Sequence, residues 1–373
     1  MRKILLSIIF TLFSCVSNAT PLYQDEINTL NLNGWLGVAL RDELDTEIID
    51  NSSRINFSFE RTENNGWTSF AVTEWGINLV DGGNNATFYN GKFSNEKDDD
   101  FLYNRLGYIG LKNDKWGKLS FGKQWGAYYS VAETTDLPNI YTGYGVGVYT
   151  FGDGGLTGTG RADSALQYSN SWGGLSIIIQ YEANNHKNIV VEESNDANIK
   201  LSDSYGASGS YYLTNEFKLV AGFNRYKINS TNNKYNEETS QIYGFGFSYG
   251  KYYHYSEGRQ ANGLYIGGNF HISDKNELYE GELFDSKGYE LMIAYHLDNG
   301  LIPLALLSHL ELEPTKDNFF TGEFNQEFLM IGLHYKFSED TVFFVENKID
   351  LSDIDGVNSG DLNGIALGIN FFF

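Results

Sequence analysis

The sequence has little of three things that many proteins use: cysteine, proline and basic side chains. Its 373 residues include 1 Cys, 4 Pro and 26 Lys+Arg against 48 Asp+Glu, which gives a formal net charge of -22. So acidic a chain lacks the basic surface that a phosphate backbone requires, and nucleic acid is not an expected partner. The 6 His show no pair at the short spacing of metal ligands. Neither a metal nor another cofactor is expected.

Long hydrophobic runs are also missing, apart from one near the amino terminus. A helix that spans a bilayer needs about 20 apolar residues, and no segment reaches that length without charges. The first residues instead combine a basic start, an apolar run over residues 4–13 and small residues up to Ala19. This pattern predicts a signal peptide over residues 1–19, cleaved after Ala19. A lipid anchor at Cys15, the only cysteine, is the alternative, which the bulky Phe13 disfavours.

Aromatic and apolar residues are plentiful, at 16% and 41%, which excludes a disordered acidic protein. Apolar and polar residues alternate with a period of two along most of the chain, and this alternation predicts β-strands with one apolar face. Sixteen strands are expected, over residues 30–41, 54–61, 67–79, 102–112, 118–124, 161–168, 175–182, 205–212, 217–227, 241–249, 263–272, 288–297, 301–312, 329–337, 341–351 and 362–373.

The expected connections alternate between short turns and long polar segments. The long ones cover residues 81–101, 125–160, 183–203, 229–240 and 273–287. Hairpins with short turns at one end and long loops at the other are typical of outer-membrane barrels. No linker interrupts the pattern, so residues 20–373 are expected to form one domain. We predict an all-β fold, a transmembrane antiparallel β-barrel that crosses the bacterial outer membrane many times.

A barrel of this size has a consequence for its interior. A closed sheet can cross hydrocarbon because every backbone polar group is paired within it. The apolar half of each alternation then faces lipid and the polar half faces the lumen. Sixteen strands enclose a lumen too wide for their own side chains to fill. The sequence therefore predicts an aqueous channel.

Two neighbouring segments carry a family resemblance. Residues 105–112, Arg-Leu-Gly-Tyr-Ile-Gly-Leu-Lys, and residues 117–124, Gly-Lys-Leu-Ser-Phe-Gly-Lys-Gln, resemble the fourth and fifth strands of the general diffusion porins of Gram-negative bacteria. With the leader, residues 161–168 and the terminal Phe373, the resemblance covers essentially the whole chain. It implies a homotrimer of sixteen-stranded barrels, each with its third loop folded inward to form an eyelet between basic wall residues and acidic loop residues.

The resemblance implies which residues form the basic wall of the eyelet. Carried over by position, they are Arg54, Arg105 and Arg161. A further basic position of the family, in the first strand, falls near Trp35, so this wall is expected to be one charge short. The alternative is that these arginines are generic lumen charges.

Alternation supports the inward direction of two of these arginines. Phe57 and its neighbours occupy the lipid face of one strand, as Leu106 and Tyr108 are expected to do on another. Arg54 and Arg105 then face the lumen. An arginine facing lipid at mid-membrane would destabilise the barrel by about 2–4 kcal/mol, and this cost favours the assignment of both side chains to the lumen.

The third loop, residues 125–160, is expected to supply the acids that face this wall. Asp136, followed by Pro138, matches the family best, whereas the family's Pro-Glu-Phe-Gly-Gly run is missing. Glu133 and Asp153 are weaker candidates for the same role.

Two further carboxylates, Glu74 and Glu346, are assigned to the lumen by alternation. The alternative is that both are ordinary solvated side chains of the lumen.

The carboxyl terminus alternates with Phe371 and Phe373 on one face. Such a last strand with a terminal Phe resembles the signal that outer-membrane proteins present to their insertion machinery. An ordinary final strand is the alternative. Outer-membrane lipid and lipopolysaccharide are the other expected partners, the latter through divalent cations bridging to surface acids.

The predicted function is passive diffusion of small hydrophilic solutes and ions through an outer-membrane porin. The acidic surplus predicts a preference for cations. Two alternatives are a surface-binding barrel that serves as an adhesin or structural anchor, and a substrate-specific channel with aromatic residues along its lumen. An enzyme is not expected.

Overall fold

The computed structural model describes residues 20–80, 84–89, 92–97, 101–183, 188–189, 199–230, 235–252, 263–279, 281–314, 318, 322–355 and 362–373. The predicted signal peptide, residues 1–19, and its Cys15 lie outside this range. No helix among the described residues is long and apolar enough to cross a membrane.

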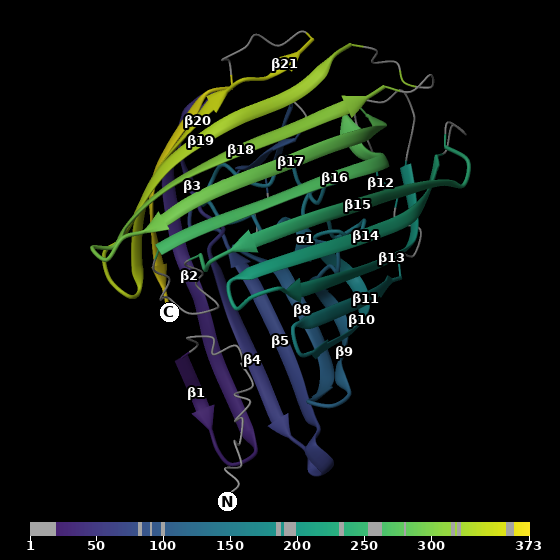
Figure 1. The fold of residues 1–373 in the computed structure, drawn as a ribbon, viewed down its shortest axis with the longest axis vertical. Coiled ribbons are helices and arrows are strands. Elements are labelled where there is room, and N and C mark those ends of the chain that lie inside the picture. Colours follow the sequence, from purple (N-terminus) through teal and green to yellow (C-terminus); the bar gives the residue numbers. More distant parts are fainter. Residues whose placement is uncertain are drawn as a thin grey trace, which may run out of the picture.

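The chain folds into a closed antiparallel β-barrel of 16 strands, which confirms the predicted fold class and strand number. The ring closes between β22 (Gly364–Phe372) and β2 (Asn28–Asp42), where Trp35 lies opposite Phe372. Figure 1 shows strands β13 to β18 crossing the direction of β4, β5 and β8, as opposite walls of a tilted barrel do. The other strands of the ring are β4 (Arg54–Thr62), β5 (Thr68–Ile77), β8 (Leu102–Asn113), β9 (Gly117–Trp125), β10 (Arg161–Trp172), β11 (Leu175–Glu182), β13 (Ile199–Tyr212), β14 (Phe217–Ser230), β15 (Glu238–Tyr249), β16 (Gly263–Tyr279), β17 (Glu282–His296), β18 (Leu301–Glu313), β19 (Phe324–Lys336) and β20 (Thr341–Asp350).

Shorter elements accompany the 16 strands of this ring. The 3-10 turn η1 (Asn64–Gly66) joins β4 to β5. β1 and β3 pair with β2, β12 pairs with β13, and β21 pairs with β19, whereas β6 and β7 form a separate hairpin. Their bounds are β1 (Thr20–Gln24), β3 (Thr46–Asp50), β6 (Asn84–Tyr89), β7 (Lys92–Lys97), β12 (Asn188–Ile189) and β21 (Asp353–Ile354).

The connection expected over residues 273–287 is instead mostly strand. β16 continues to Tyr279, β17 begins at Glu282, and these two residues pair directly. The prediction failed because the two faces of the sheet exchange character here. The outer side chain of Lys287 is exposed and charged, whereas Phe284 is buried inside with Leu310 and Leu312. Polar outer residues therefore made a strand look like a loop.

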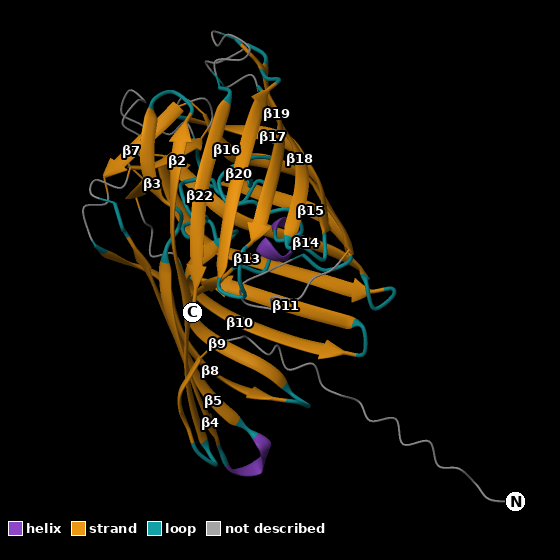
Figure 2. Cartoon of the chain, turned by 90° about the vertical axis from the view of Figure 1, so that its left-hand side faces the viewer, coloured by secondary structure: helices purple, strands orange, loops and turns teal. Residues whose placement is uncertain are grey.

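The third loop, here called L3 and comprising residues 126–160, lies inside the barrel. It contains the short helix α1 (Tyr129–Ala132), which Figures 1 and 2 show within the ring of strands. Val131 of α1 packs against Val220 of β14 and Ile242 of β15 in a buried apolar cluster. The expected inward-folded loop is therefore present, and apolar packing holds its first turn against the wall.

A β-bulge alters the alternation that was used to orient Arg105. Glu74 of β5 pairs with Leu106, but Trp75 pairs with Asn104, so Arg105 is the extra residue. Leu106 is buried beside Glu74, and Tyr108 packs edge-on against the buried Phe70. The assignment of Leu106 and Tyr108 to the lipid face was wrong because a bulge exchanges the faces of the residues on its two sides.

Candidate pore constriction

Arg54 and Arg105 converge on one carboxylate of the same wall. The Nε of Arg105 donates to Oε1 of Glu74 at 2.9 Å, and Nη1 of Arg54 lies 3.9 Å from the same oxygen. Asn56 donates to the other Glu74 oxygen at 3.3 Å. The exposed fractions of Arg54, Arg105 and Glu74 are 7%, 5% and 8%. One of the two positive charges of this group is thus balanced on the wall itself.

The ring of Trp35 packs against the guanidinium group of Arg54. The guanidinium carbon of Arg54 lies 3.5 Å from the Trp35 ring centroid, a distance at which a cation is attracted by the ring face. Arg54 Nε donates to the Ser52 carbonyl at 2.9 Å, and Trp35 Nε1 donates to the Asn51 carbonyl at 3.1 Å. Trp35 therefore occupies the position where a further basic residue was sought and orients Arg54.

The strand β2, which is the first strand of the ring, nevertheless carries a basic side chain at a different position. Arg41 of β2 is buried and pairs with Glu47 of β3, to which its Nε donates at 3.1 Å. Alternation along β2 from Trp35 to Arg41 could have indicated this position.

Arg161 lies in a second charged group, apart from Glu74. Its Nε lies 3.2 Å from Asp153, and Lys123 Nζ lies 3.0 Å from Asp153 and 2.7 Å from Asp163. Burial alone would raise the pKa of Asp153, but the charges of Arg161 and Lys123 outweigh it and hold that pKa below its usual value. Two cations and two carboxylates therefore balance where L3 joins β10. Lys123, which was not predicted, completes the group.

The other two predicted acids of L3 lie in different surroundings. Glu133 is exposed and pairs with Lys218 of β14 at 2.7 Å. Asp136 accepts hydrogen bonds from two tyrosines of L3, Tyr129 at 2.8 Å and Tyr149. The structure thus brings Asp153 to Arg161, pairs Glu133 with β14, and fixes Asp136 within the loop.

Glu346 of β20 holds the tip of L3. Its two carboxylate oxygens accept the backbone N–H groups of Asn139 at 2.7 Å, Ile140 at 2.9 Å and Tyr141 at 3.2 Å. The Nε2 of His334 lies 2.9 Å from Oε1 of the same carboxylate. The exposed fraction of Glu346 is 0%. Glu346 is therefore an anchor for the loop rather than a solvated lumen residue.

Glu290 of β17 provides a second anchor, which the sequence analysis did not find. It accepts hydrogen bonds from the Thr135 hydroxyl at 2.6 Å, the Gly145 amide at 3.2 Å and the Ser308 hydroxyl at 3.0 Å. It shares the buried face of β17 with Met292. The signal available in the sequence was a carboxylate directly before the buried apolar positions Met292 and Ala294 of the same face.

Glycines of the wall leave room for L3. A Cβ atom at Gly267 of β16 would lie 1.9 Å from the Thr134 carbonyl oxygen, and one at Gly288 of β17 would lie 2.6 Å from that of Gly145. Real Cβ atoms do not approach other atoms so closely, and the loop would have to move. These glycines therefore allow close approach of the loop backbone.

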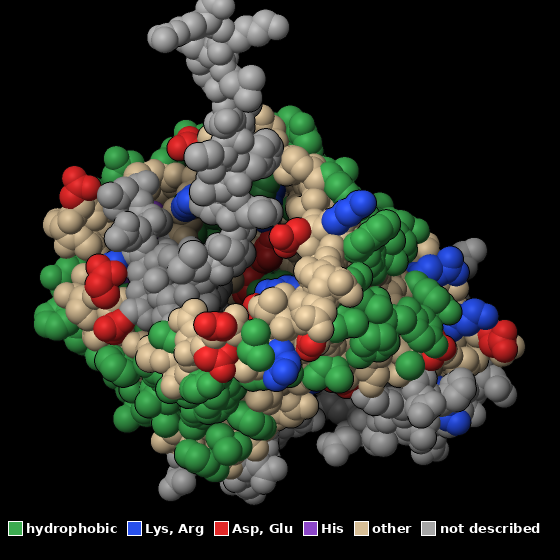
Figure 3. Space-filling model, turned by 90° about the horizontal axis from the view of Figure 1, so that it is seen from below, with side chains coloured by type: hydrophobic (Ala, Val, Ile, Leu, Met, Phe, Trp, Pro, Cys, Tyr) green, Lys and Arg blue, Asp and Glu red, His purple; other side chains and the backbone are tan. Residues whose placement is uncertain are grey.

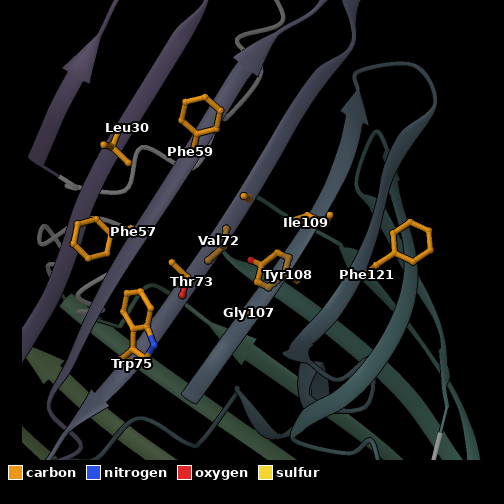
Figure 4. A pocket seen from close by; sticks show the side chains of 11 residues that line it. Leu30, Phe57, Phe59, Val72, Thr73, Trp75, Gly107, Tyr108, Ile109 and Phe121 are labelled. Atoms are coloured by element: carbon orange, nitrogen blue, oxygen red, sulfur yellow. The ribbon is translucent and has the colours of Figure 1, made fainter. Parts of the chain in front are cut away.

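The molecule is hollowed when seen from below, and Figure 3 shows acidic and basic side chains at this hollow. A different depression lies on the outer face of β2, β4, β5, β8 and β9, with a volume of about 620 Å³. Figure 4 shows Phe57, Phe59 and Trp75 along it, with Ile109 and Phe121 across from them. Its lining is apolar, so it belongs to the surface that faces lipid or another protein. The described residues contain no group of three or more side chains suited to hold a metal ion.

Comparisons with known proteins agree with this architecture. A family model described as Gram-negative porin matches residues 9–351. The chain is 23% identical to outer membrane protein Omp-EA of Erwinia amylovora over 403 residues, which cover 100% of both chains. It is 24% identical to outer membrane porin C of Rahnella aquatilis, covering 93% of this chain and 100% of that protein.

Two solved structures illustrate the likeness of fold. OmpF of Salmonella typhi superposes with a TM-score of 0.70 at 19% identity, covering 94% of this chain and 99% of that one. The trimer form of OmpT of Vibrio cholerae superposes with a TM-score of 0.63 at 17% identity, covering 93% of this chain and 100% of that one.

Proposed function

Because this chain belongs to the Gram-negative porin family, we propose that it forms a water-filled channel for passive diffusion of small hydrophilic solutes and ions. As a porin it is a channel protein of the outer membrane, which it crosses many times. The observation that carries the proposal is the closed barrel of 16 strands with L3 fixed inside it. Such a barrel encloses an aqueous lumen, and an inward loop narrows that lumen.

The anchors of L3 indicate which side of the lumen stays open. They lie on β17 and β20, and Gln180 of β11 also holds the loop by accepting the Ala127 amide at 3.0 Å. Arg54 and Arg105 stand on β4 and β8, elsewhere in the ring. The proposed solute path runs between L3 and this basic wall.

The charges along this path give it a field. The arginines lie on the wall, and the Asp136 carboxylate lies on the loop. A solute that carries dipoles or hydrogen-bonding groups can align in such a field, whereas an apolar solute has to displace oriented water. We propose that this arrangement favours small polar solutes and sets their upper size through L3.

A preference for cations follows from the overall charge. The chain carries a formal net charge of -22, and a mouth lined by one sign of charge raises the local concentration of counter-ions. Salt attenuates this effect, since the Debye length is about 10 Å at 0.1 M. Reversal potentials in a salt gradient should therefore indicate cation selectivity, more strongly at low salt, and anion selectivity would contradict this part of the proposal.

We further propose that the protein acts as a homotrimer. The apolar depression shown in Figure 4 has too few polar groups to bind a hydrophilic solute. A neighbouring copy of the protein would cover it. The OmpT structure recorded in a trimer form supports this assembly by analogy. The remaining lipid-facing surface would contact lipid and lipopolysaccharide. Chemical cross-linking in native membranes should give a product of three copies.

Liposome swelling with sugars of increasing size tests the diffusion proposal. Liposomes that contain the purified protein should swell quickly in small sugars and progressively more slowly in larger ones. A surface-binding barrel would give no swelling at all. A substrate-specific channel would respond to one sugar without regard to size.

A further inference from the structure

Lys348 of β20 is a buried cation that none of the family motifs accounts for. It is the next residue after Glu346 on the inner face of the strand, and the exposed fraction of its side chain is 3%. Its ammonium group pairs with the carboxylate of Glu43, whose side chain is 4% exposed. Glu43 lies in the turn between β2 and β3, at the end of the barrel that carries the longer connections. This ion pair therefore reaches past β22, which separates β2 from β20.

Aromatic rings surround the same ammonium group. Its Nζ lies 5.4 Å from the ring centroid of Tyr141, 5.7 Å from that of Tyr144 and 5.9 Å from that of Phe328. These distances are within the range of cation–π attraction. Tyr141 and Tyr144 belong to L3, whereas Phe328 belongs to β19. Lys348 therefore contacts the β2–β3 turn, the tip of L3 and the wall at one point.

The burial of the charged side chains of Lys348 and Glu43 requires a physical explanation. Removing two ions from water is costly, and an apolar pair of similar volume would serve packing alone equally well or better. An ion pair with ring contacts differs from apolar packing because it fixes the direction of each partner. The backbone of Asn139 to Tyr141 is fixed by Glu346, and the rings of Tyr141 and Tyr144 are fixed by Lys348. Two successive inner residues of β20 thus hold both the backbone and the side chains of the loop tip.

We propose that Lys348 and Glu43 are positioning residues that couple the β2–β3 turn to the tip of L3 and so set the width of the constriction. This inference rests on the proposed function as a diffusion channel. Arg41 and Glu47 support it, because their ion pair fixes the two strands at the base of the same turn. The turn that carries Glu43 then acts as a second segment that shapes the constriction, beside L3 itself.

Substitutions in the full-length protein test the coupling. We expect K348M, and separately E43Q, to increase the current fluctuations of the open channel and to raise swelling in the larger sugars several-fold relative to the smaller ones. K348R should behave as the wild type, because it keeps the cation. K287M is the matched control: it removes an exposed ion pair with Glu313 on the outer face and should change neither readout.

Amide hydrogen exchange of the peptide around residues 139–144 measures the same coupling without any current. Exchange of this peptide should be faster in K348M and in E43Q than in the wild type, and unchanged in K287M. Wild-type exchange and wild-type sugar discrimination in correctly folded K348M and E43Q would overturn the inference. If K348M fails to fold, the isosteric E43Q decides by the same criteria. A wild-type protein that conducts no current would instead overturn the proposed function. Amide hydrogen exchange would still test the coupling between the β2–β3 turn and the tip of L3.

Discussion

At the residue scale, Glu74 determines how much positive charge the basic wall presents. It lies within 2.9 Å of Arg105 and 3.9 Å of Arg54, and all three side chains are almost completely buried. Removing one partner of such a group leaves an uncompensated charge, which typically destabilises a fold by about 3–5 kcal/mol. The wall therefore depends on Glu74 both for its charge and for its order.

Two neutralising substitutions should shift ion selectivity in opposite directions. E74Q leaves Arg54 and Arg105 without their carboxylate and should move the reversal potential towards anions. R105Q should move it towards cations. The double substitution E74Q/R105Q should return close to the wild type, because the two charge changes cancel and the partners are in direct contact.

The control for this series is E327Q, which neutralises a carboxylate paired with His309 on β18, outside the proposed constriction. It should leave selectivity unchanged. Shifts of the same sign in E74Q and R105Q would show that this group does not set the field along the solute path.

At the scale of elements, the docking of L3 depends on the shape of the wall as much as on hydrogen bonds. Gly267 of β16 lets the Thr134 carbonyl approach the strand, and the Tyr265 hydroxyl donates to the same oxygen at 2.7 Å. The loop and the wall therefore touch backbone to backbone. A change of one methyl group at this contact has to move the loop.

The substitution G267A should displace L3 into the lumen. We expect a lower single-channel conductance than in the wild type, together with a lower temperature at which the folded form is lost on heating. G209A on β13 is the matched control, because the nearest atom to its new Cβ would lie 3.9 Å away. Equal conductance of G267A and G209A would contradict a tight contact between L3 and β16.

The last strand suggests a test of assembly. Phe373 and Gly34 exchange backbone hydrogen bonds of 3.1 Å, and Phe371 is exposed on the outer face. Deleting residues 371–373 should remove both the closing hydrogen bonds and the proposed signal to the insertion machinery, so less protein should reach the outer membrane in cell fractionation. Normal surface levels of the truncated protein would refute the role of Phe371 and Phe373 as an assembly signal.

Strands and the location of L3 could be predicted from sequence, because alternation and loop length are local properties. The bulge at Arg105 could not, since an extra residue appears only when two paired strands are compared. The anchoring role of Glu346 was missed for a similar reason: its partners lie 205–207 residues away in the chain. Long-range hydrogen bonds between a loop and a wall leave no periodic signal.

At the scale of the whole molecule, one channel accounts for three features: the closed barrel, the inward loop and the surplus of acidic residues. In the proposed function each feature limits a different property: the ring limits the outer dimension, L3 the size of the solute, and charge the ion preference. The apolar outer depression is the surface that we propose for association between copies. The central claim is that water and ions pass through this barrel without a bound substrate.

Single-channel recording in planar bilayers tests that claim most directly. Folded, purified protein should raise the current in discrete steps that are proportional to voltage at low potentials and that increase with bulk salt concentration, as a water-filled pore requires. A trimer should close in three equal steps. Folded protein that inserts into the bilayer without any step above the lipid baseline would contradict the account.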